Sequence, residues 1–536
     1  MKEKLKYIVA GLLLVLSGSC NDWLNIKPLD KMVEEDYWKT GNDVESVVLA
    51  CYRAMEEDDF MQRIILGGEL RSDNVMVDVS TLHSTQDQQD INDANINVTN
   101  GLLPWKPFYT VINYCNTVLK NAPGVMDKDP TYTSGYLHAH EAEVLTLRAL
   151  AYFYLVRLYR DVPYIDFPYS DDTQNVNVPK MDGDSILNLQ VDALLTAEKS
   201  SLKSWGNSQS QKGRITKNTV RALLADIYLW LGKYDECIDA CNRIMPDVIP
   251  YDEILNPDLA TGAELRLIDN QKNYMNSFNS LFCQTNSAES IFELQFNSTV
   301  QNNEIPDLYG NYTTMGKLAA SSAAVIPFQD NAFTNDLRGM FSFVRDFSTS
   351  GTTGQGVSQI FKYIGNFYII MADGVSYSFN TSTIADMDWI VYRLADVYLM
   401  KAEALVERNT GSDLSDAMAL VNLIYLRSNL TALPLMLTNY PSQDLMQSLV
   451  LDERQREFMF EGKRWFDLVR LARKEDRENG LNNHPKMLEL VTRKYQFNAD
   501  VVRSKLRFMD ALYLPVAQSE LIANKALVQN PYYNVE

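Results

Sequence analysis

The fold is decided by the stretch RALLADIYLWLGKYDECIDAC, residues 221–241 of the chain. Its apolar residues recur every three or four positions on both sides of Gly232, which indicates two amphipathic helices joined by a tight turn. Ala225 is the small residue that allows the helices to approach, Gly232 ends the first helix, and Tyr234 packs over the turn. The stretch therefore predicts a helical hairpin.

The same pattern returns in YRLADVYLMKAEAL, residues 392–405, and after a longer turn Ala417, Val421 and Ile424 face inward from a second helix. Both stretches follow the tetratricopeptide pattern, and two further helical segments match it more weakly. Each helix pair of this kind buries its apolar face only against neighbouring pairs, so the pairs must stack. The sequence thus predicts a mainly α fold, a tetratricopeptide-like helical-repeat superhelix.

Two segments have a different composition. Residues 71–104 are rich in Asp, Asn, Gln, Ser and Thr, and residues 270–390 mix short apolar runs with Asn, Ser, Thr and Gly. Within the second segment, Ser290–Phe296 alternates between the two faces of a strand. Long loops on a rigid scaffold usually carry function. We expect an N-terminal helical part over residues 41–270, a loop-rich, partly β ligand-binding insert over residues 271–390, and a C-terminal helical part over residues 391–536.

The N-terminus predicts export and lipidation. Three lysines precede an apolar run over residues 8–16, which is too short to span a bilayer, and the small residues Ser-Gly-Ser then lead directly to Cys20. This order is typical of a bacterial lipoprotein signal, although an ordinary signal peptide with a chance cysteine would share part of it. We expect a signal peptide over residues 1–19, a lipid on Cys20 and a lipidated tether over residues 20–40, which would hold the protein on a membrane.

Charge and cysteine usage exclude several classes of function. The formal net charge is −20, so nucleic acid and acidic polysaccharides are poor partners for the chain. Five cysteines remain after Cys20, and an odd number argues against a disulfide framework. Cys237 and Cys241 are four residues apart and could hold a metal, but no His lies nearby, so we interpret both as small buried residues. The sequence predicts no metal, no cofactor and no catalytic constellation.

A second stretch, DERQREFMFEGKRWFDLVR over residues 452–470, resembles the hallmark of the SusD/RagB family of nutrient-binding outer-membrane lipoproteins. Other parts of the chain resemble the same family in the same order. They are the cysteine signal, Arg148–Pro163, Ile215–Asp235, Glu289–Phe296, Tyr392–Ala404, LYLP at 512–515 and NPYY at 530–533. The chain departs from the family pattern at Arg160, where the family usually has glycine.

The hallmark stretch predicts a helix from Leu451 to Leu468 that contributes to the core. Leu451, Phe458 and Trp465 are seven residues apart and share one face of such a helix. The glutamates at 453, 457 and 461 form a carboxylate stripe, with Arg464 beyond them. Paired carboxylates can be catalytic, but carboxylates on one regular helix do not face each other across a cleft, so we expect a structural ion-pair network.

The resemblance implies capture of a nutrient, most often a glycan, at the outer surface of the outer membrane, and delivery to a SusC-like TonB-dependent transporter. It implies a binding protein and not an enzyme. A surface glycoside hydrolase lipoprotein and a peptide-binding or protein-interaction scaffold remain alternatives. The family usually places ligand-binding groups after the Glu289–Phe296 segment, which here offers Tyr309, Asn311 and Tyr312. Asn92 and Asn95 could add polar contacts, while the tyrosines could instead merely pack the loop.

Overall fold

The computed structural model describes most of the chain from residue 37 to residue 534. The ranges are 37–77, 84–170, 173–245, 281–300, 303–310, 316–328, 336–343, 359–363, 386–429, 432–495 and 497–534, with residues 265, 267 and 278 and the backbone of 366–371 and 374–379. Cys20, the predicted signal peptide and most of the predicted tether lie outside these residues. Within the described ranges, no helix has both the length and the apolar character needed to cross a membrane.

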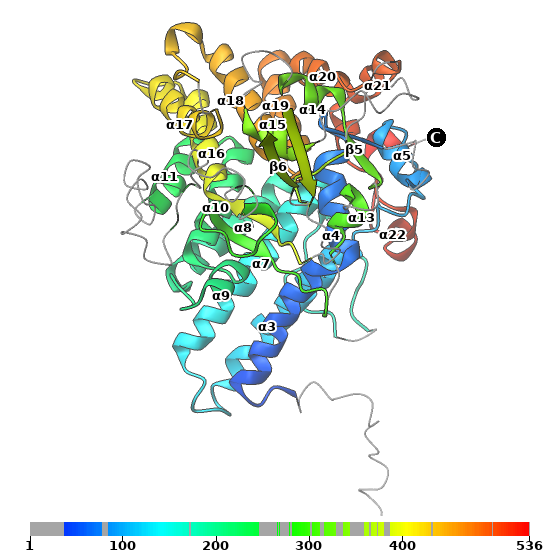
Figure 1. Ribbon diagram of the computed structural model, residues 1–536. Helices are drawn as coiled ribbons and strands as arrows, with labels where there is room; N and C mark the ends of the chain where they lie inside the picture. The colour runs from blue at the N-terminus through cyan, green and yellow to red at the C-terminus, as the bar shows by residue number, and fades with distance from the viewer. Residues whose placement is uncertain are drawn as a thin grey trace, which may run out of the picture.

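The first half of the fold is built from helices. They are α3 (Gly41–Glu56), α4 (Asp58–Ile65), the π-helix η1 (Leu66–Leu70), α5 (Gln86–Asn92), α6 (Lys106–Asn121), η2 (Ala122–Val125), α7 (Ser134–Tyr159), α8 (Gly183–Ser200), α9 (Ser208–Gly213), α10 (Lys217–Leu231) and α11 (Tyr234–Ile244). Helices α3, α6 and α7 pack on one another and form a narrow arm at the bottom of Figure 1. The mainly α, helical-repeat fold is confirmed.

The second half adds further helix pairs. They are α16 (Leu394–Arg408), α17 (Asp413–Ser428), η6 (Leu437–Asn439), α18 (Gln443–Phe458), α19 (Arg464–Asn479), α20 (Pro485–Thr492), α21 (Ala499–Leu506), η7 (Met509–Leu512), α22 (Gln518–Ala523) and η8 (Pro531–Tyr533). Helix α11 packs against α16, so the two tetratricopeptide-like hairpins are neighbours in the stack.

The helical hairpin α10–α11 forms where the sequence predicts it. Gly232 has φ +72°, a left-handed conformation that favours glycine, and its N–H donates to the carbonyls of Tyr228 and Leu229 at the end of α10. Cys237 and Cys241 are both buried, and the Cys237 thiol lies 4.0 Å from the carbonyl oxygen of Met400 on α16. Their small side chains therefore serve close helix packing, as the sequence predicts.

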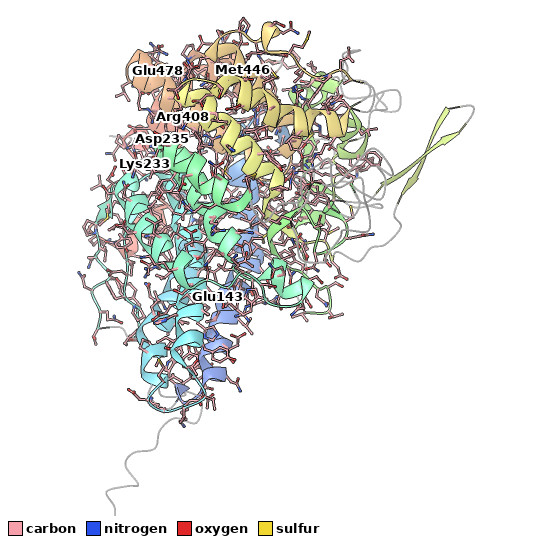
Figure 2. The ribbon with its side chains drawn as sticks, turned by 90° about the vertical axis from the view of Figure 1, so that its left-hand side faces the viewer. Glu143, Lys233, Asp235, Arg408, Met446 and Glu478 are labelled. Carbon is pink, nitrogen blue, oxygen red and sulfur yellow. The ribbon has the colours of Figure 1, made fainter. Side chains whose placement is uncertain are left out.

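Short strands, and the short helices of the insert, complete the fold. They are β1 (Val75–Val77), β2 (Val162–Pro163), β3 (Lys180–Met181), β4 (Ser290–Leu294), α13 (Ile305–Tyr309), β5 (Leu318–Ala320), α14 (Ser322–Val325), η5 (Ile326–Phe328), α15 (Leu337–Ser342), β6 (Asn366–Met371), β7 (Gly374–Phe379) and β8 (Trp389–Arg393). All four pairings, β1–β5, β2–β3, β4–β8 and β6–β7, are antiparallel. The β6–β7 hairpin projects from the body in Figure 2.

The prediction of one continuous helix from Leu451 to Leu468 is wrong. Helix α18 ends at Phe458 and α19 begins at Arg464, because Phe460 and Gly462 adopt φ +68° and +72° in the turn between them. This turn docks on η1: a Cβ on Gly68 would lie 1.9 Å from the carbonyl oxygen of Gly462, and the Gly462 N–H donates to Glu69 at 2.9 Å. Backbone contact between distant segments thus requires the break.

The carboxylate stripe is a buried ion-pair network, as expected, although Glu461 lies in the turn. Arg393 bonds Glu457 at 2.6 Å, and its other donors reach Glu461 at 2.8 and 2.9 Å. Burial would raise the pKa of Glu461, but the charges of Arg393 and Lys362 outweigh burial and lower this pKa to about 2. Arg464 takes no part, because it forms a bidentate pair with Asp73 at 2.8 and 2.9 Å.

The network, which we call the arginine–glutamate cluster, joins several segments. Its members are Glu289, Asp336, Arg338, Lys362, Arg393, Arg427, Glu453, Glu457 and Glu461, and each is at most 4% exposed except Glu457 at 5%. Arg338 of α15 reaches Glu453 at 2.7 Å and Glu457 at 2.9 Å, while Lys362 reaches Glu461 at 2.6 Å. The insert is therefore tied to α18 and its following turn by buried charges.

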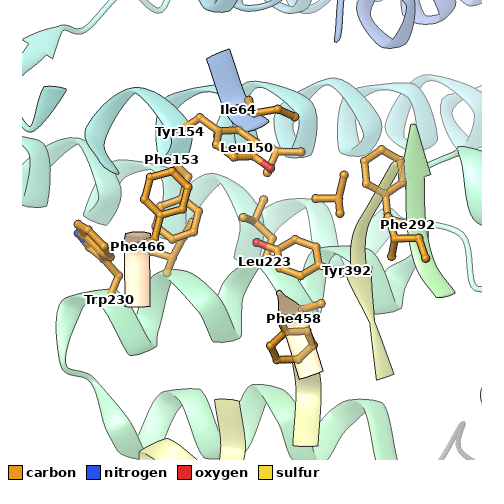
Figure 3. Packing of buried hydrophobic residues seen from close by; sticks show 14 of the residues in the cluster. Ile64, Leu150, Phe153, Tyr154, Leu223, Trp230, Phe292, Tyr392, Phe458 and Phe466 are labelled. Carbon is orange, nitrogen blue, oxygen red and sulfur yellow. The ribbon is translucent and has the colours of Figure 1, made fainter. Parts of the chain in front are cut away.

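One apolar core runs through the stack. Figure 3 shows Tyr154, Phe153 and Phe466 packed between helices, with the Trp230 ring edge-on to Phe153 at 6.2 Å between centroids. Trp465 is 1% exposed, and the Arg71 guanidinium lies 4.3 Å from its ring centroid. The expectation that the hallmark stretch contributes to the core is confirmed for this residue.

Replacing Trp465 with alanine should leave a large void and lower the free energy of unfolding by about 3–5 kcal/mol. Thermal melting followed by circular dichroism measures the change. Phe497→Ala is the matched control, since Phe497 is 82% exposed and its removal should leave the melting temperature unchanged. An unchanged melting temperature for Trp465→Ala would contradict the assignment of this ring to the core.

Glu69 should give the protein a pH-dependent stability. Burial raises the pKa of this fully buried carboxyl from 4.5 to about 8, against the hydrogen bonds from Gly462 and Lys463. Between these two values the folded state keeps a proton that the unfolded chain releases, so stability falls as the pH rises, by up to about 1.4 kcal/mol per unit. Glutamine can accept the same Gly462 bond without ionising. Denaturant unfolding at pH 5 to 8 should therefore show that the free energy of unfolding of Glu69→Gln rises relative to that of the wild type as the pH rises. Parallel pH dependences of the two proteins would refute this.

Candidate functional site

Tyr309 lies in the core and not on the surface. It ends α13, its side chain is 1% exposed, and its ring stacks on Tyr363 with 5.9 Å between centroids and 6° between planes. Because both faces are covered by protein, the ring offers no platform to a ligand in this structure. The alternative that this tyrosine packs the loop fits the geometry better, and Asn311 and Tyr312 lie outside the described residues.

Asn92 and Asn95 are held by lysines of the C-terminal part. The Asn92 side-chain oxygen accepts from Lys494 Nζ at 3.2 Å, and the exposed Asn95 accepts from Lys505 Nζ at 2.9 Å. Their role in ligand binding stays a prediction. The structure does bring their polar segment next to the insert, because β1 pairs with β5 in the register Val77↔Leu318. The two segments therefore meet, but the predicted site residues that the structure describes, Tyr309, Asn92 and Asn95, do not form one site.

A different set of side chains surrounds an open hollow, which we call the Trp105 hollow. It encloses about 530 Å³ between one face of α6, the loop that follows α7, and α22. On the side of α6 the hollow is lined by Trp105, which directly precedes the helix, and by Tyr109 and Asn113. The adjacent row is Lys106, Thr110 and Tyr114. Residues four apart lie on the same side of a helix, so the two rows form one continuous wall.

Hydrogen bonds fix the opposite wall to α6. The Tyr109 hydroxyl donates to the carbonyl of Pro163 at 2.6 Å, and the Asn113 side-chain oxygen accepts from the Tyr169 N–H at 2.7 Å. The Tyr169 hydroxyl in turn donates to the carbonyl of Asn175 at 2.8 Å. The aromatic rings are therefore held by backbone bonds before any ligand arrives, which lowers the entropic cost of binding.

Glu520 is the single carboxylate among the described residues that line the Trp105 hollow. Burial raises its pKa, and hydrogen bonds from Trp105 only partly offset this effect. Tyr114, at 39% exposure, presents its ring to solvent at the rim. Sugar rings stack their C–H faces on aromatic rings, and their hydroxyls bind carboxylate and amide groups. The hollow offers both kinds of group, whereas glycoside hydrolysis requires two carboxyl groups flanking the bond.

The tyrosines of α6 are not among the residues that the sequence predicts for the site. A signal was present, since Tyr109 and Tyr114 are large aromatic residues on a helix whose core face is already filled by Phe108 and Ile112. No sequence pattern marks Glu520 as a site residue, because it lies near the C-terminal end of the chain and folding alone brings it to the hollow.

Fold and hollow together define a helical-repeat protein with a preformed aromatic hollow. Two family models match the chain: one described as the SusD family over residues 345–533, and one described as starch-binding associating with the outer membrane over residues 22–229. Together the two ranges span well over half of the sequence. The chain belongs to the SusD family.

Relatives extend the likeness over the whole chain. SusD-like protein P2 of Formosa agariphila is 25% identical, with 99% of each chain covered, and a SusD-like protein of Bacteroides ovatus is 22% identical, covering 88% of this chain and 82% of that one. Among solved structures, a laminarin-binding SusD-like protein has a TM-score of 0.66 at 21% identity, covering 92% of this chain and 100% of its own. Surface glycan-binding protein A of Bacteroides uniformis has a TM-score of 0.69 at 19% identity with the same coverage. At these identities the structures show a shared fold.

Proposed function

We propose that the protein is a cell-surface lipoprotein of the outer membrane that captures a glycan without cleaving it and delivers it to a SusC-like TonB-dependent transporter. The observation that carries glycan binding is the Trp105 hollow, in which fixed aromatic rings lie beside one half-buried carboxylate. The description of one family model as starch-binding, and the laminarin- and glycan-binding names of two structural neighbours, support the same ligand class.

The charge of the chain narrows the class of glycan. At a net charge of −20, the protein repels polyanions at long range. In the hollow itself, Lys106 and Glu520 both belong to the lining, so the lining has no excess of positive charge for a uronate or sulfate. The proposed ligand is therefore a neutral oligosaccharide or polysaccharide.

Isothermal titration calorimetry of the purified full-length protein should detect binding of a neutral oligosaccharide in a panel of maltoheptaose, laminarihexaose, xylohexaose and mannohexaose. Tyr114→Ala should weaken binding about tenfold, which corresponds to about 1.4 kcal/mol for a lost ring contact. Glu520→Gln tests the carboxylate, and Phe497→Ala is an exposed aromatic control outside the hollow.

Three results would contradict parts of this proposal. Binding that is equally strong in Tyr114→Ala and Glu520→Gln would move the site elsewhere on the protein. Absence of binding to every sugar in the panel, with binding of a peptide, would favour the peptide-binding alternative. New reducing ends after incubation with the protein would favour the glycoside hydrolase alternative.

The anchor and the partner can be tested together. Purification in mild detergent through a C-terminal tag should recover one large TonB-dependent transporter, since a stable complex buries at least about 1,000 Å². Cys20→Ala should leave the membrane fraction and lose most of this partner, because lipidation confines both proteins to one membrane and raises their effective concentration. Recovery of the lipidated protein alone at high yield would contradict delivery to a transporter, and a membrane-bound Cys20→Ala variant would contradict the lipid site.

A further inference from the structure

A second hollow, which we call the Trp205 hollow, lies at the tip of the arm. It encloses about 800 Å³ and is lined by the N-terminal turns of α3 and α7 and by the segments on either side of α9. The chain enters the described part of the structure at this end, at Tyr37, and the arm tip is the lowest part of the coloured ribbon in Figure 1. The Trp105 hollow is built from the other end of α6, so the two hollows share no lining residue.

The indole of Trp205 is fixed in place on one side of this hollow. Its Nε1–H donates to the carbonyl of Ile215 at 3.1 Å, and the Arg214 guanidinium lies 3.7 Å from its ring centroid. Arg214 is itself held by Glu45 at 2.7 Å and by Glu143 at 2.6 Å. Glu143, labelled in Figure 2, lies above the tip of the arm. The aromatic wall is therefore rigid before a ligand arrives.

A hydrogen-bonded chain forms the floor of the hollow. His140 Nε2 lies 2.8 Å from Glu45, and the Tyr132 hydroxyl lies 3.0 Å from His140 Nδ1. Hydrogen bonds from His140 and then Arg214, against burial, lower the pKa of Glu45 to about 2. Glu45 is therefore a carboxylate at every physiological pH, and it can accept hydrogen bonds from a ligand hydroxyl.

The charges that face the hollow select against anions. Asp129 contributes a second carboxylate, which accepts from Gly41 N–H at 2.9 Å and from the Thr131 hydroxyl at 2.6 Å. Arg214 is the one arginine or lysine among the described lining residues, and its donors are already directed to Glu45 and Glu143. A uronate, sulfate or phosphate would meet two carboxylates and no available cation.

The rim offers groups suited to a sugar. Tyr136, in the first turn of α7, is 61% exposed, so one large ring stands at the mouth of the hollow. Asn42 and Thr133 add an amide and a hydroxyl beside it. Exposed rings next to amide, hydroxyl and carboxylate groups match the C–H faces and hydroxyls of a saccharide.

From this geometry we propose that the Trp205 hollow is a second saccharide site, which takes a neutral oligosaccharide at the tip of the arm. The inference rests on the proposed glycan-binding function and adds a second, separate site to it. A glycan chain longer than the distance between the hollows would contact the protein at both of them.

Calorimetry with the same four neutral oligosaccharides should resolve two sites per chain. Tyr136→Ala should abolish binding at the Trp205 hollow, or weaken it at least fivefold, and leave the Trp105 hollow intact. Tyr114→Ala should affect only binding at the Trp105 hollow. Tyr136→Phe keeps the ring and should retain both sites, and the double variant Tyr114→Ala/Tyr136→Ala should lose both. Because Tyr136 is mostly exposed, its variants should melt like the wild type, and Phe497→Ala is again the matched control.

The outcomes separate this inference from the proposed function. One site per chain that is lost in Tyr114→Ala and unchanged in Tyr136→Ala overturns the second site and leaves the proposed function standing. Absence of binding to all four sugars overturns both. Binding of an oligogalacturonate that depends on Tyr136 overturns the charge argument, and binding of a peptide but of no sugar at this hollow overturns the saccharide class.

Discussion

Arg393 holds together parts of the molecule that are far apart in the sequence. Its guanidinium bonds Glu289 of the insert, Glu457 of α18 and Glu461 of the following turn, and it is fully buried. Removing one partner from such a group leaves an uncompensated charge in a medium of low polarity, which typically costs about 3–5 kcal/mol. Each of these segments must therefore be in place for the others to be stable, and the hallmark stretch of the family is the part that supplies two of the three carboxylates.

The same constraint explains why the insert can carry loops without losing its position. Arg338 and Lys362 anchor it to α18 and to the turn at Glu461, while β5 pairs with β1 and β4 with β8. The stack of helices provides rigid walls, and the two hollows lie where helix ends and connecting loops meet those walls. Both hollows have aromatic rings fixed by backbone hydrogen bonds, so their shape follows from the scaffold.

The repeat fold could be predicted because its signals are local. Gly232 and the small residues around it lie within one hairpin, and the structure places them as the pattern requires. The break between α18 and α19 at Gly462 could not be predicted from local sequence, because its cause is the contact with Gly68, almost 400 residues earlier in the chain. The candidate site depends on the fold in a related way: the resemblance to the family implies Tyr309 as a candidate, whereas the structure buries its ring against Tyr363, and Glu520 reaches Trp105 only after folding. Arg160 shows the same limit, since it adopts φ +65° where the family usually has glycine and is held there by an ion pair with Asp510.

The five cysteines after Cys20 are buried or half-buried, so their thiols should react only slowly with thiol reagents in the folded protein. Burial raises the pKa of Cys283 to about 12, and the pKa of Cys237 is also raised by burial, so neither thiol ionises near neutral pH. A cysteine introduced at an exposed position would then be the reactive thiol among the described residues. Fluorophores or spin labels could be attached at chosen points of the arm without first removing the native cysteines, and movements of the protein on a membrane could be followed by distance measurements in the otherwise unaltered chain.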